Sequence, residues 1–80
     1  MTGPRLTPER RRMLKLLARS RHGVNEELLV HGHGFRQQTV VGLIRVGLAT
    51  ADREILKAGA KAIEVVRIKI TEVGRKAIEG

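Results

Sequence analysis

The polar residues at positions 36–38 are the best candidates for chemistry in this chain. They are Arg36, Gln37 and Gln38. Guanidinium and amide side chains carry several hydrogen-bond donors in a fixed geometry. They stand at the start of a stretch in which Val40, Leu43 and Ile44 recur at the spacing of a helix with one buried side. Backbone N–H groups are unpaired at a helix start, and positions 36–48 contain no acidic residue.

A helix end with this composition suits a polyanion. In the major groove of DNA, Arg pairs with guanine and Gln with adenine, so this end predicts base reading. Arg45 lies on the same polar face further along the helix. The plainer alternative is that these side chains are only the solvated face of an amphipathic helix, and the rest of the chain has to decide between the two.

The composition limits what the chain can be. Eighty residues make one small domain with a modest core. Without cysteine there is no disulfide, no thiolate metal site and no cysteine nucleophile. Phe35 is the only aromatic residue, so the core must be aliphatic, and the stacking platforms of many single-strand binders are missing. The net charge of +8 and a pI near 11.4 favour nucleic acid or an anionic membrane as partner.

The hydropathy pattern favours a cytoplasmic protein. No apolar run approaches the ~20 residues that a transmembrane helix needs. No apolar segment of a signal peptide follows the N-terminus. We therefore expect a cytoplasmic location and no membrane.

Helix signals divide the first half of the chain. Residues 1–6 are expected to form a flexible tail and residues 7–80 a single domain. Thr7-Pro8-Glu9 combines an N-cap, a favoured first helical residue and an acid that complements the helix dipole. This motif predicts a helix that runs to about Arg21. Asn25 is a second N-cap candidate and predicts a short helix that ends near His31.

A glycine-containing turn at 31–34 then leads into the helix expected at about 36–46. Phe35 is expected to point back into the core. Gly42 lies inside this helix, where glycine costs ~1 kcal/mol relative to alanine. It therefore predicts a close approach between helices, or a gap for DNA backbone as the sharper alternative.

The second half of the chain changes to the period of strands. Residues 62–71 read AIEVVRIKIT, which alternates between two sides and is rich in β-branched residues. Their partner is expected at 50–56, with a glycine-centred loop at 57–61, so the pattern predicts a β-hairpin. The basic residues of this hairpin are Arg53, Lys57, Lys61, Arg67 and Lys69. A short last helix is expected after Thr71, with Val73, Ala77 and Ile78 packed on the core.

The first helix is the most basic part of the chain. Its basic residues and those just after it are Arg10, Arg11, Arg12, Lys15, Arg19 and Arg21. They could be a solvated face whose aliphatic stems cover apolar surface, or a strip that faces phosphate. An amphipathic helix on an anionic membrane is disfavoured, because the helix lacks Trp and Phe anchors and the core needs its leucines.

Catalytic and metal-binding sites are not expected. His22, His31 and His33 have no cysteine and no well-placed carboxylates beside them in the sequence. Ser20 is the only serine and falls on an apolar helix face, Asp52 is the only aspartate, and the sequence offers no pocket for paired carboxylates. We expect no enzyme, no metal and no cofactor.

The order of the expected elements is helix, helix, turn, helix, hairpin and helix. This order is that of a winged helix-turn-helix, an α+β fold that is mainly helical, with a three-helix core, a β-hairpin wing and a short C-terminal helix. The run GLIRVGL at 42–48 resembles the passage from recognition helix to wing in MarR- and PadR-like bacterial regulators. The run IKITEVGRKAI at 68–78 resembles the exit from the wing, where a Leu/Ile-Thr-x-x-Gly-Arg pattern is common. The likeness covers about residues 7–80.

This resemblance implies a third helix in the major groove and a wing on the DNA backbone or minor groove. The residues that it places on DNA are Arg36, Gln37, Gln38 and Thr39 as base readers, Arg45 on a phosphate, and Arg53, Lys57 and Lys61 on the wing. Those regulators have further helices that build a dimer and often a ligand site. The 80 residues leave no room for them, so neither the usual dimer nor ligand control is expected. A homodimer of another kind or a larger protein complex stays open.

The sequence thus predicts a small transcriptional regulator or architectural accessory factor that binds double-stranded DNA. Two alternatives stay open: a protein-interaction module that offers its basic strip at 10–21 to an acidic partner, and an RNA-binding winged helix. The target site, the regulated pathway and any effector are not encoded in these patterns.

Overall fold

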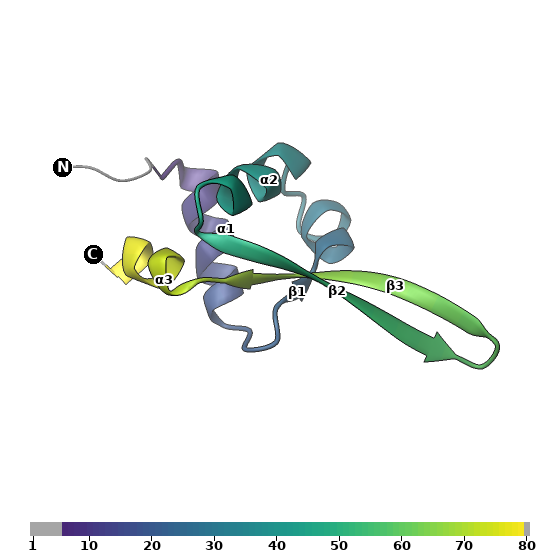
Figure 1. Ribbon diagram of the computed structural model, residues 1–80. Coiled ribbons are helices and arrows are strands. Elements are labelled where there is room, and N and C mark those ends of the chain that lie inside the picture. Colours follow the sequence, from purple (N-terminus) through teal and green to yellow (C-terminus); the bar gives the residue numbers. More distant parts are fainter. Residues whose placement is uncertain (1–5, 80) are drawn as a thin grey trace.

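The computed structural model describes residues 6–79, and its helices pack on a three-stranded antiparallel sheet to form a small α+β domain (Figure 1). In chain order the elements are α1 (Pro8–Ala18), β1 (Val24–Asn25), η1 (Leu28–Gly32), α2 (Gln37–Arg45), β2 (Ala49–Ala58), β3 (Lys61–Ile70) and α3 (Glu72–Glu79). The strand order is β1–β3–β2. Most of the expected tail lies outside the described residues, and its last residue, Leu6, is half-buried against the core.

Helix α1 begins where the sequence predicts and ends earlier. The Oγ1 of Thr7 accepts a hydrogen bond of 3.1 Å from the backbone N–H of Arg10, as expected of an N-cap. The prediction that the helix continues to about Arg21 is wrong, because it ends at Ala18. The chain continues there in a tighter, 3₁₀-type turn, in which the N–H of Ser20 donates to the carbonyl of Leu17 at 3.0 Å.

The short second helix differs from its prediction in two ways. It is preceded by strand β1, which pairs with β3 and was not predicted. The Oδ1 of Asn25 accepts from the N–H of Glu27 at 2.8 Å, the expected capping contact, but the helix then widens into the π-type turn η1. There the N–H of His33 donates to the carbonyl of Leu28 at 2.9 Å. The chain leaves this turn so that Phe35 packs half-buried against the core, as expected.

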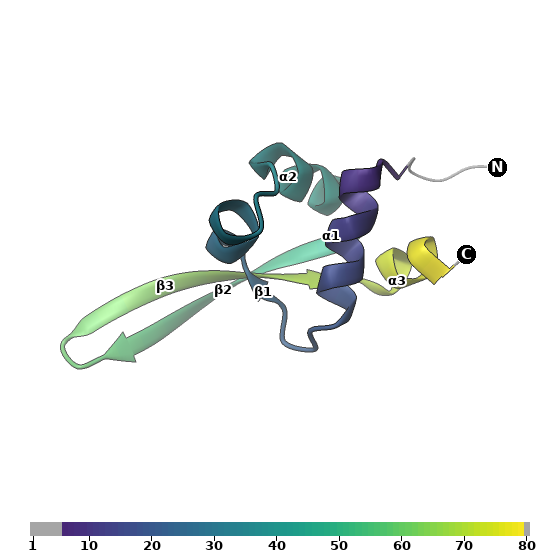
Figure 2. The same ribbon diagram turned by 180° about the vertical axis from the view of Figure 1, so that it is seen from behind.

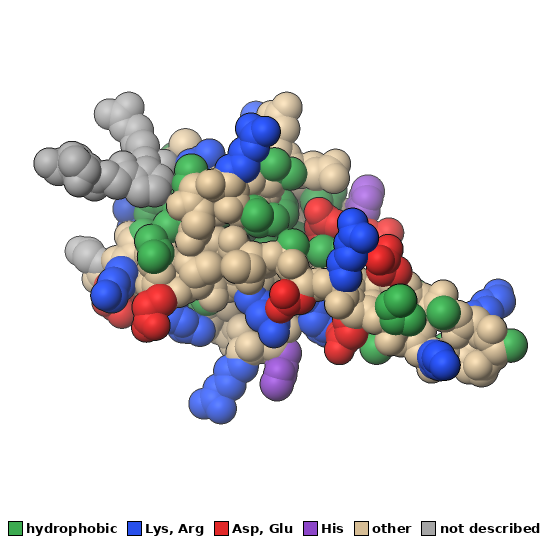
Figure 3. All heavy atoms as spheres, viewed as in Figure 1, with side chains coloured by type: hydrophobic (Ala, Val, Ile, Leu, Met, Phe, Trp, Pro, Cys, Tyr) green, Lys and Arg blue, Asp and Glu red, His purple; other side chains and the backbone are tan. Residues whose placement is uncertain are grey.

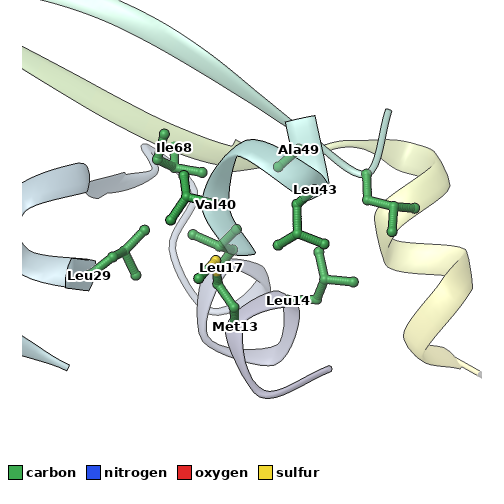
Figure 4. Close-up of a cluster of buried hydrophobic side chains, with 9 residues drawn as sticks. Met13, Leu14, Leu17, Leu29, Val40, Leu43, Ala49 and Ile68 are labelled. Atoms are coloured by element: carbon green, nitrogen blue, oxygen red, sulfur yellow. The ribbon is translucent and has the colours of Figure 1, made fainter. Parts of the chain in front are cut away.

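Nine buried apolar side chains from α1, η1, α2 and the base of the sheet form the core (Figure 4). They are Met13, Leu14, Leu17, Leu29, Val40, Leu43, Leu48, Ala49 and Ile68. Val40 and Leu43 of α2 point toward the leucines of α1. Because these two residues are fixed inward, the opposite side of α2 must face outward.

The β2–β3 hairpin is longer than predicted, and its turn is shorter. The predicted loop at 57–61 is wrong, because Lys57 pairs with Ala62 and Ala58 pairs with Lys61. Only the residues at 59 and 60 remain for the turn, and the first of them, Gly59, has a φ of +66°. A two-residue hairpin turn needs such a conformation, which glycine adopts without strain, so pairing can continue to the tip.

The outer part of the hairpin projects far from the core. All residues from 50 to 64 are exposed. The domain measures 52 Å along its long axis and only 23 and 20 Å across it. Figures 1 and 2 show that the hairpin accounts for this length, with α3 at the opposite end of the molecule from the hairpin tip.

Thr71 ties the base of the hairpin to the end of α2. Its N–H donates to the carbonyl of Leu48 at 3.0 Å, and its Oγ1 donates to the carbonyl of Gly47 at 2.7 Å. The same Oγ1 accepts from the N–H of Gly74 at 3.0 Å and so caps α3. Gly74 is buried directly against the carbonyl of Leu48, where no Cβ fits. The Thr-x-x-Gly pattern of the sequence is therefore explained by this junction, in which Thr71 forms the hydrogen bonds and Gly74 allows the close contact.

Helix α3 packs on the core with a different face from the one expected. Ala77 and Ile78 pack against the core, as predicted. Val73 was expected to do the same, but its side chain is 56% exposed. Close contact at Gly74 sets the orientation of the helix, and the preceding residue is then turned outward.

We predict that Gly74→Ala destabilises the protein by about 1–3 kcal/mol, because the new methyl group would overlap the carbonyl of Leu48. Chemical denaturation measures the loss. Gly42→Ala is the matched control: it also lies inside a helix, but the only side chain in the way is the flexible end of Arg10, 2.6 Å from the built Cβ. That variant should be as stable as the wild type or more so by up to ~1 kcal/mol. Equal losses in the two variants would contradict this account of the junction.

Candidate nucleic-acid interface

The outer face of α2 brings together most of the helix residues singled out in the sequence. A shallow hollow on this face is lined by Gln37, Gln38, Val41, Gly42 and Arg45. The two glutamines and the arginine are exposed. Val41 lies between them and is 44% exposed, although it is apolar. Sequence reasoning missed Val41, yet its position four residues after Gln37 and four before Arg45 could have placed it on this face.

The start of α2 holds an acid that sequence reasoning did not place there. The N-cap of α2 is Arg36, whose backbone N–H donates to Oε2 of Glu9 at 2.9 Å. The expectation of a helix end without a carboxylate is therefore wrong. The acid arrives from α1, 27 residues earlier in the chain, and only the packing of the two helices brings it there. A carboxylate in this place also complements the positive end of the helix dipole.

The environment of Glu9 favours its charged form. The hydrogen bond from the backbone of Arg36 lowers the pKa of Glu9 most. Burial opposes this effect, while the hydroxyl of Thr39 and the guanidinium groups of Arg36 and Arg12 lower the pKa further. Thr39, predicted as a base reader, is half-buried and interacts with this carboxylate. The structure therefore places Thr39 beside the acid that holds the start of the helix.

Three arginines surround this acid, so the surface at the start of α2 stays cationic. A groove between α1 and α2 is lined by Thr7, Pro8, Glu9, Arg10, Arg12, Arg36, Gln38 and Thr39. Arg10 reaches across to Gly42, so a flexible side chain of α1, and not its backbone, lies against this glycine. Two arginines of the predicted basic strip thus belong to the same surface as the start of α2.

The rest of that strip faces elsewhere. Arg11, Lys15 and Arg19 follow one another at intervals of four residues along α1 and its C-cap, and all three are exposed. They form a separate cationic stripe outside the groove between α1 and α2. Arg21, the last residue of the predicted strip, is exposed in the turn after α1.

Ion pairs divide the charge of the hairpin into an inner and an outer part. The three pairs are Arg53–Glu64 at 3.8 Å, Arg67–Glu54 at 2.7 Å and Lys69–Asp52 at 3.3 Å. They use every carboxylate of the two strands. Arg53, predicted to touch DNA, is therefore paired with an acid. Lys57 and Lys61 are the only basic residues of the hairpin without such a partner, and all hairpin residues lie within the described part of the chain.

The two tip lysines do not share a face of the hairpin. Residues directly opposite in an antiparallel pair point to the same side, and neighbours along a strand point to opposite sides. Lys57 lies opposite Ala62, whereas Lys61 lies opposite Ala58. The two ammonium groups are therefore presented on opposite faces of the ribbon. In the view of Figure 3 the far end of the hairpin shows basic and hydrophobic groups and no acidic side chain.

The start of α2 and the hairpin lie toward the same end of the domain. Helix α2 runs back from this end and then turns into β2, which returns toward it (Figures 1 and 2). The predicted site residues thus fall in two groups: a compact one on α2 and a distant one at the hairpin tip, joined by the paired inner half of the hairpin.

All three histidines are exposed. Within residues 6–79, no group of three or more histidine, aspartate or glutamate side chains is placed to hold a metal ion. No helix formed by these residues is long and apolar enough to cross a membrane.

Comparisons of the chain with protein-family models, with curated proteins and with solved structures found no match.

Glu9 generates a prediction about pH. A carboxyl group whose pKa is lowered by folding stabilises the protein above its unfolded pKa, and this stabilisation is lost as the pH falls through the folded pKa. Glu9→Gln should therefore be less stable than the wild type near neutral pH. The difference should shrink as the pH falls below the ordinary glutamate value of 4.5. Urea denaturation across this range measures it, with the exposed Glu27→Gln as the control. A deficit that does not change with pH would show that the charge of Glu9 plays no part.

Proposed function

We propose that this chain is a winged helix-turn-helix that binds double-stranded DNA in the cytoplasm, as a small regulator or an architectural accessory factor. Helix α2 is the recognition helix and the β2–β3 hairpin is the wing. The element order and the sheet order β1–β3–β2 are compatible with this fold. The resemblance of residues 42–48 and 68–78 to MarR- and PadR-like regulators supports the same assignment, because both runs fall where α2 enters and β3 leaves the hairpin.

The outer face of α2 is the observation that carries the proposal. Burial of Val40 and Leu43 directs Gln37, Gln38 and Arg45 outward together. No carboxylate lines this face, and the only acid at its start is already bonded to the backbone of the helix. A face with two amides, a guanidinium and an apolar centre has the groups that distinguish base pairs in the major groove.

The proposed mechanism separates affinity from specificity. Arg10, Arg12 and Arg36 beside the start of α2 neutralise phosphates and release counterions, which gives affinity for any sequence. Gln37 and Gln38 then read base edges, preferably adenine, while Val41 offers contact to a thymine methyl group. Lys57 and Lys61 add contacts at a distance through the hairpin.

A second candidate function rests on the stripe of Arg11, Lys15 and Arg19. Its regular spacing and exposure suit an acidic protein partner. Random duplex DNA, structured RNA and an acidic polypeptide, compared in salt-dependent gel shifts, separate the possibilities. The proposal requires duplex DNA to compete best, and stronger binding of RNA or of the polypeptide would contradict it.

Replacing both glutamines with alanine should weaken specific binding far more than non-specific binding. Each good bidentate contact contributes about 1–3 kcal/mol, so the double variant should lose at least ~30-fold in affinity for its preferred duplex. The preferred duplex is selected from a random pool, and fluorescence anisotropy gives both affinities. Val73→Ala, on the exposed side of α3, is the control. An equal loss on specific and random DNA would remove Gln37 and Gln38 as readers.

Lys57→Gln/Lys61→Gln should flatten the salt dependence of binding. Two phosphate contacts contribute about 1.8 to the slope of log K against log salt, because each contributes ~0.9. The matched control is Arg75→Gln/Lys76→Gln, which removes the same charge from exposed positions on α3 at the far end of the molecule. It should leave the slope nearly unchanged. If both double variants shift the slope equally, only net charge matters and the hairpin does not touch DNA.

A further inference from the structure

The outer half of the hairpin carries apolar side chains that nothing in the domain covers. Ile55, Leu56 and Ile63 are 64%, 42% and 50% exposed, respectively. A two-stranded ribbon with uncovered aliphatic residues and unpaired edges is prone to association unless a partner occupies it. We therefore treat the outer half of the hairpin as a binding surface separate from the outer face of α2.

The chemistry of this segment is uniform. Residues 55–63 read ILKAGAKAI and contain no acid. Apart from Lys57 and Lys61, they also contain none of the polar side chains that read base edges in the major groove. Asp52 and Glu54 lie further in, and Glu64 lies directly opposite Ile55 at the inner limit of this segment. Each of these three carboxylates is in an ion pair. The outer half is thus an aliphatic surface with two free positive charges.

Both faces of the ribbon share this chemistry. Ile55 and Lys57 lie on one face, and Leu56, Ile63 and Lys61 lie on the other. A partner that packs on one face, such as a second copy of this chain or a flat membrane, would leave apolar groups of the opposite face in water. A groove with two walls and a row of phosphates on each side covers both faces and pairs both lysines.

We propose that the outer half of the β2–β3 hairpin, residues 55–63, enters the minor groove of duplex DNA and opens it, so that the protein bends its DNA. This inference rests on the proposed function. The apolar groups would contact the deoxyribose walls, and Lys57 and Lys61 would reach phosphates of opposite strands.

The dimensions explain why bending follows from insertion. A sheet with side chains on both faces is ~10 Å thick, judged from the spacing of packed sheets. The minor groove of B-DNA is only ~6 Å wide. Insertion must therefore widen it, and apolar side chains that enter the minor groove kink the duplex by roughly 20–90° toward the major groove. The outer half begins six residues beyond the hairpin base, ~20 Å at ~3.3 Å per residue, which is about half a helical turn of DNA.

Energy transfer between dyes at the two ends of a duplex of about three helical turns, with a central A·T-rich segment, tests this proposal. Binding of the wild type should bring the ends closer. Ile55→Thr/Leu56→Thr/Ile63→Thr keeps the strand preference of the hairpin and removes its apolar surface. This variant should still bind the duplex, while the ends return toward their separation in free DNA. Leu28→Thr and Val73→Thr, at exposed positions outside the hairpin, should bend DNA like the wild type.

A second measurement on the wild type needs no variant. Netropsin, which occupies the minor groove of A·T-rich DNA, should abolish the change in energy transfer. Wild-type binding without a change in energy transfer, or a change that netropsin leaves intact, would overturn the inference and leave the proposed function standing. A threonine variant that bends DNA like the wild type would do the same. Absence of any duplex binding by the wild type would instead remove the proposed function.

Sedimentation of the free protein distinguishes the competing occupant. We expect a monomer mass for the wild type and for the threonine variant. A wild-type dimer that becomes monomeric in the threonine variant would show that a second copy covers the hairpin, and the minor-groove assignment would fall.

Discussion

The arrangement of the whole molecule depends on the junction where α2 ends, the hairpin begins and α3 follows it. Thr71 bonds to the carbonyls of Gly47 and Leu48, and Gly74 lies against the second of these. The first two bonds join segments more than 20 residues apart in the chain. Beyond this junction the hairpin is held by its own pairing, by the two residues of β1 and by the packing of Ile68 in the core. The junction therefore helps to fix the angle between α2 and the hairpin, and with it the relative position of the two surfaces that we assign to DNA.

Local chemistry made much of this fold predictable, and contacts between distant segments account for what was missed. Thr7, Asn25 and Thr71 each form the cap that their residue type favours. The strand at residues 62–70 was also predictable, because side chains that alternate between two faces are a local property of a strand. By contrast, β1 contains only two residues and exists because β3 lies beside it. The exposed position of Val73 follows from the close contact of Gly74 with Leu48, which exists only in the folded junction.

The candidate site shows the same division. The outward face of α2 could be derived from the buried positions of Val40 and Leu43, since helical geometry fixes both sides at once. The carboxylate at its start could not, because Glu9 belongs to another helix and the sequence explains it fully as an acid in the first turn of α1. The faces of Lys57 and Lys61 depended on the turn: a five-residue loop would have left them unpaired, whereas a two-residue turn assigns each to one side.

The acidic side chains of the hairpin determine where unpaired positive charge remains on the surface. Exposed ion pairs contribute little to stability, so the three pairs of the inner hairpin have a weak structural reason to exist. Their effect on the surface is clearer, since they neutralise the inner hairpin and leave the free charge at α2, on α1 and at the tip. A single helix with two or three base-reading side chains discriminates by only a few kcal/mol, near the lower end of the ~4–10 kcal/mol that separates specific from non-specific DNA binding. Under the proposed function, a second source of selectivity would add to what α2 supplies. An arm that deforms the minor groove provides one, because the cost of the deformation depends on the sequence that is deformed.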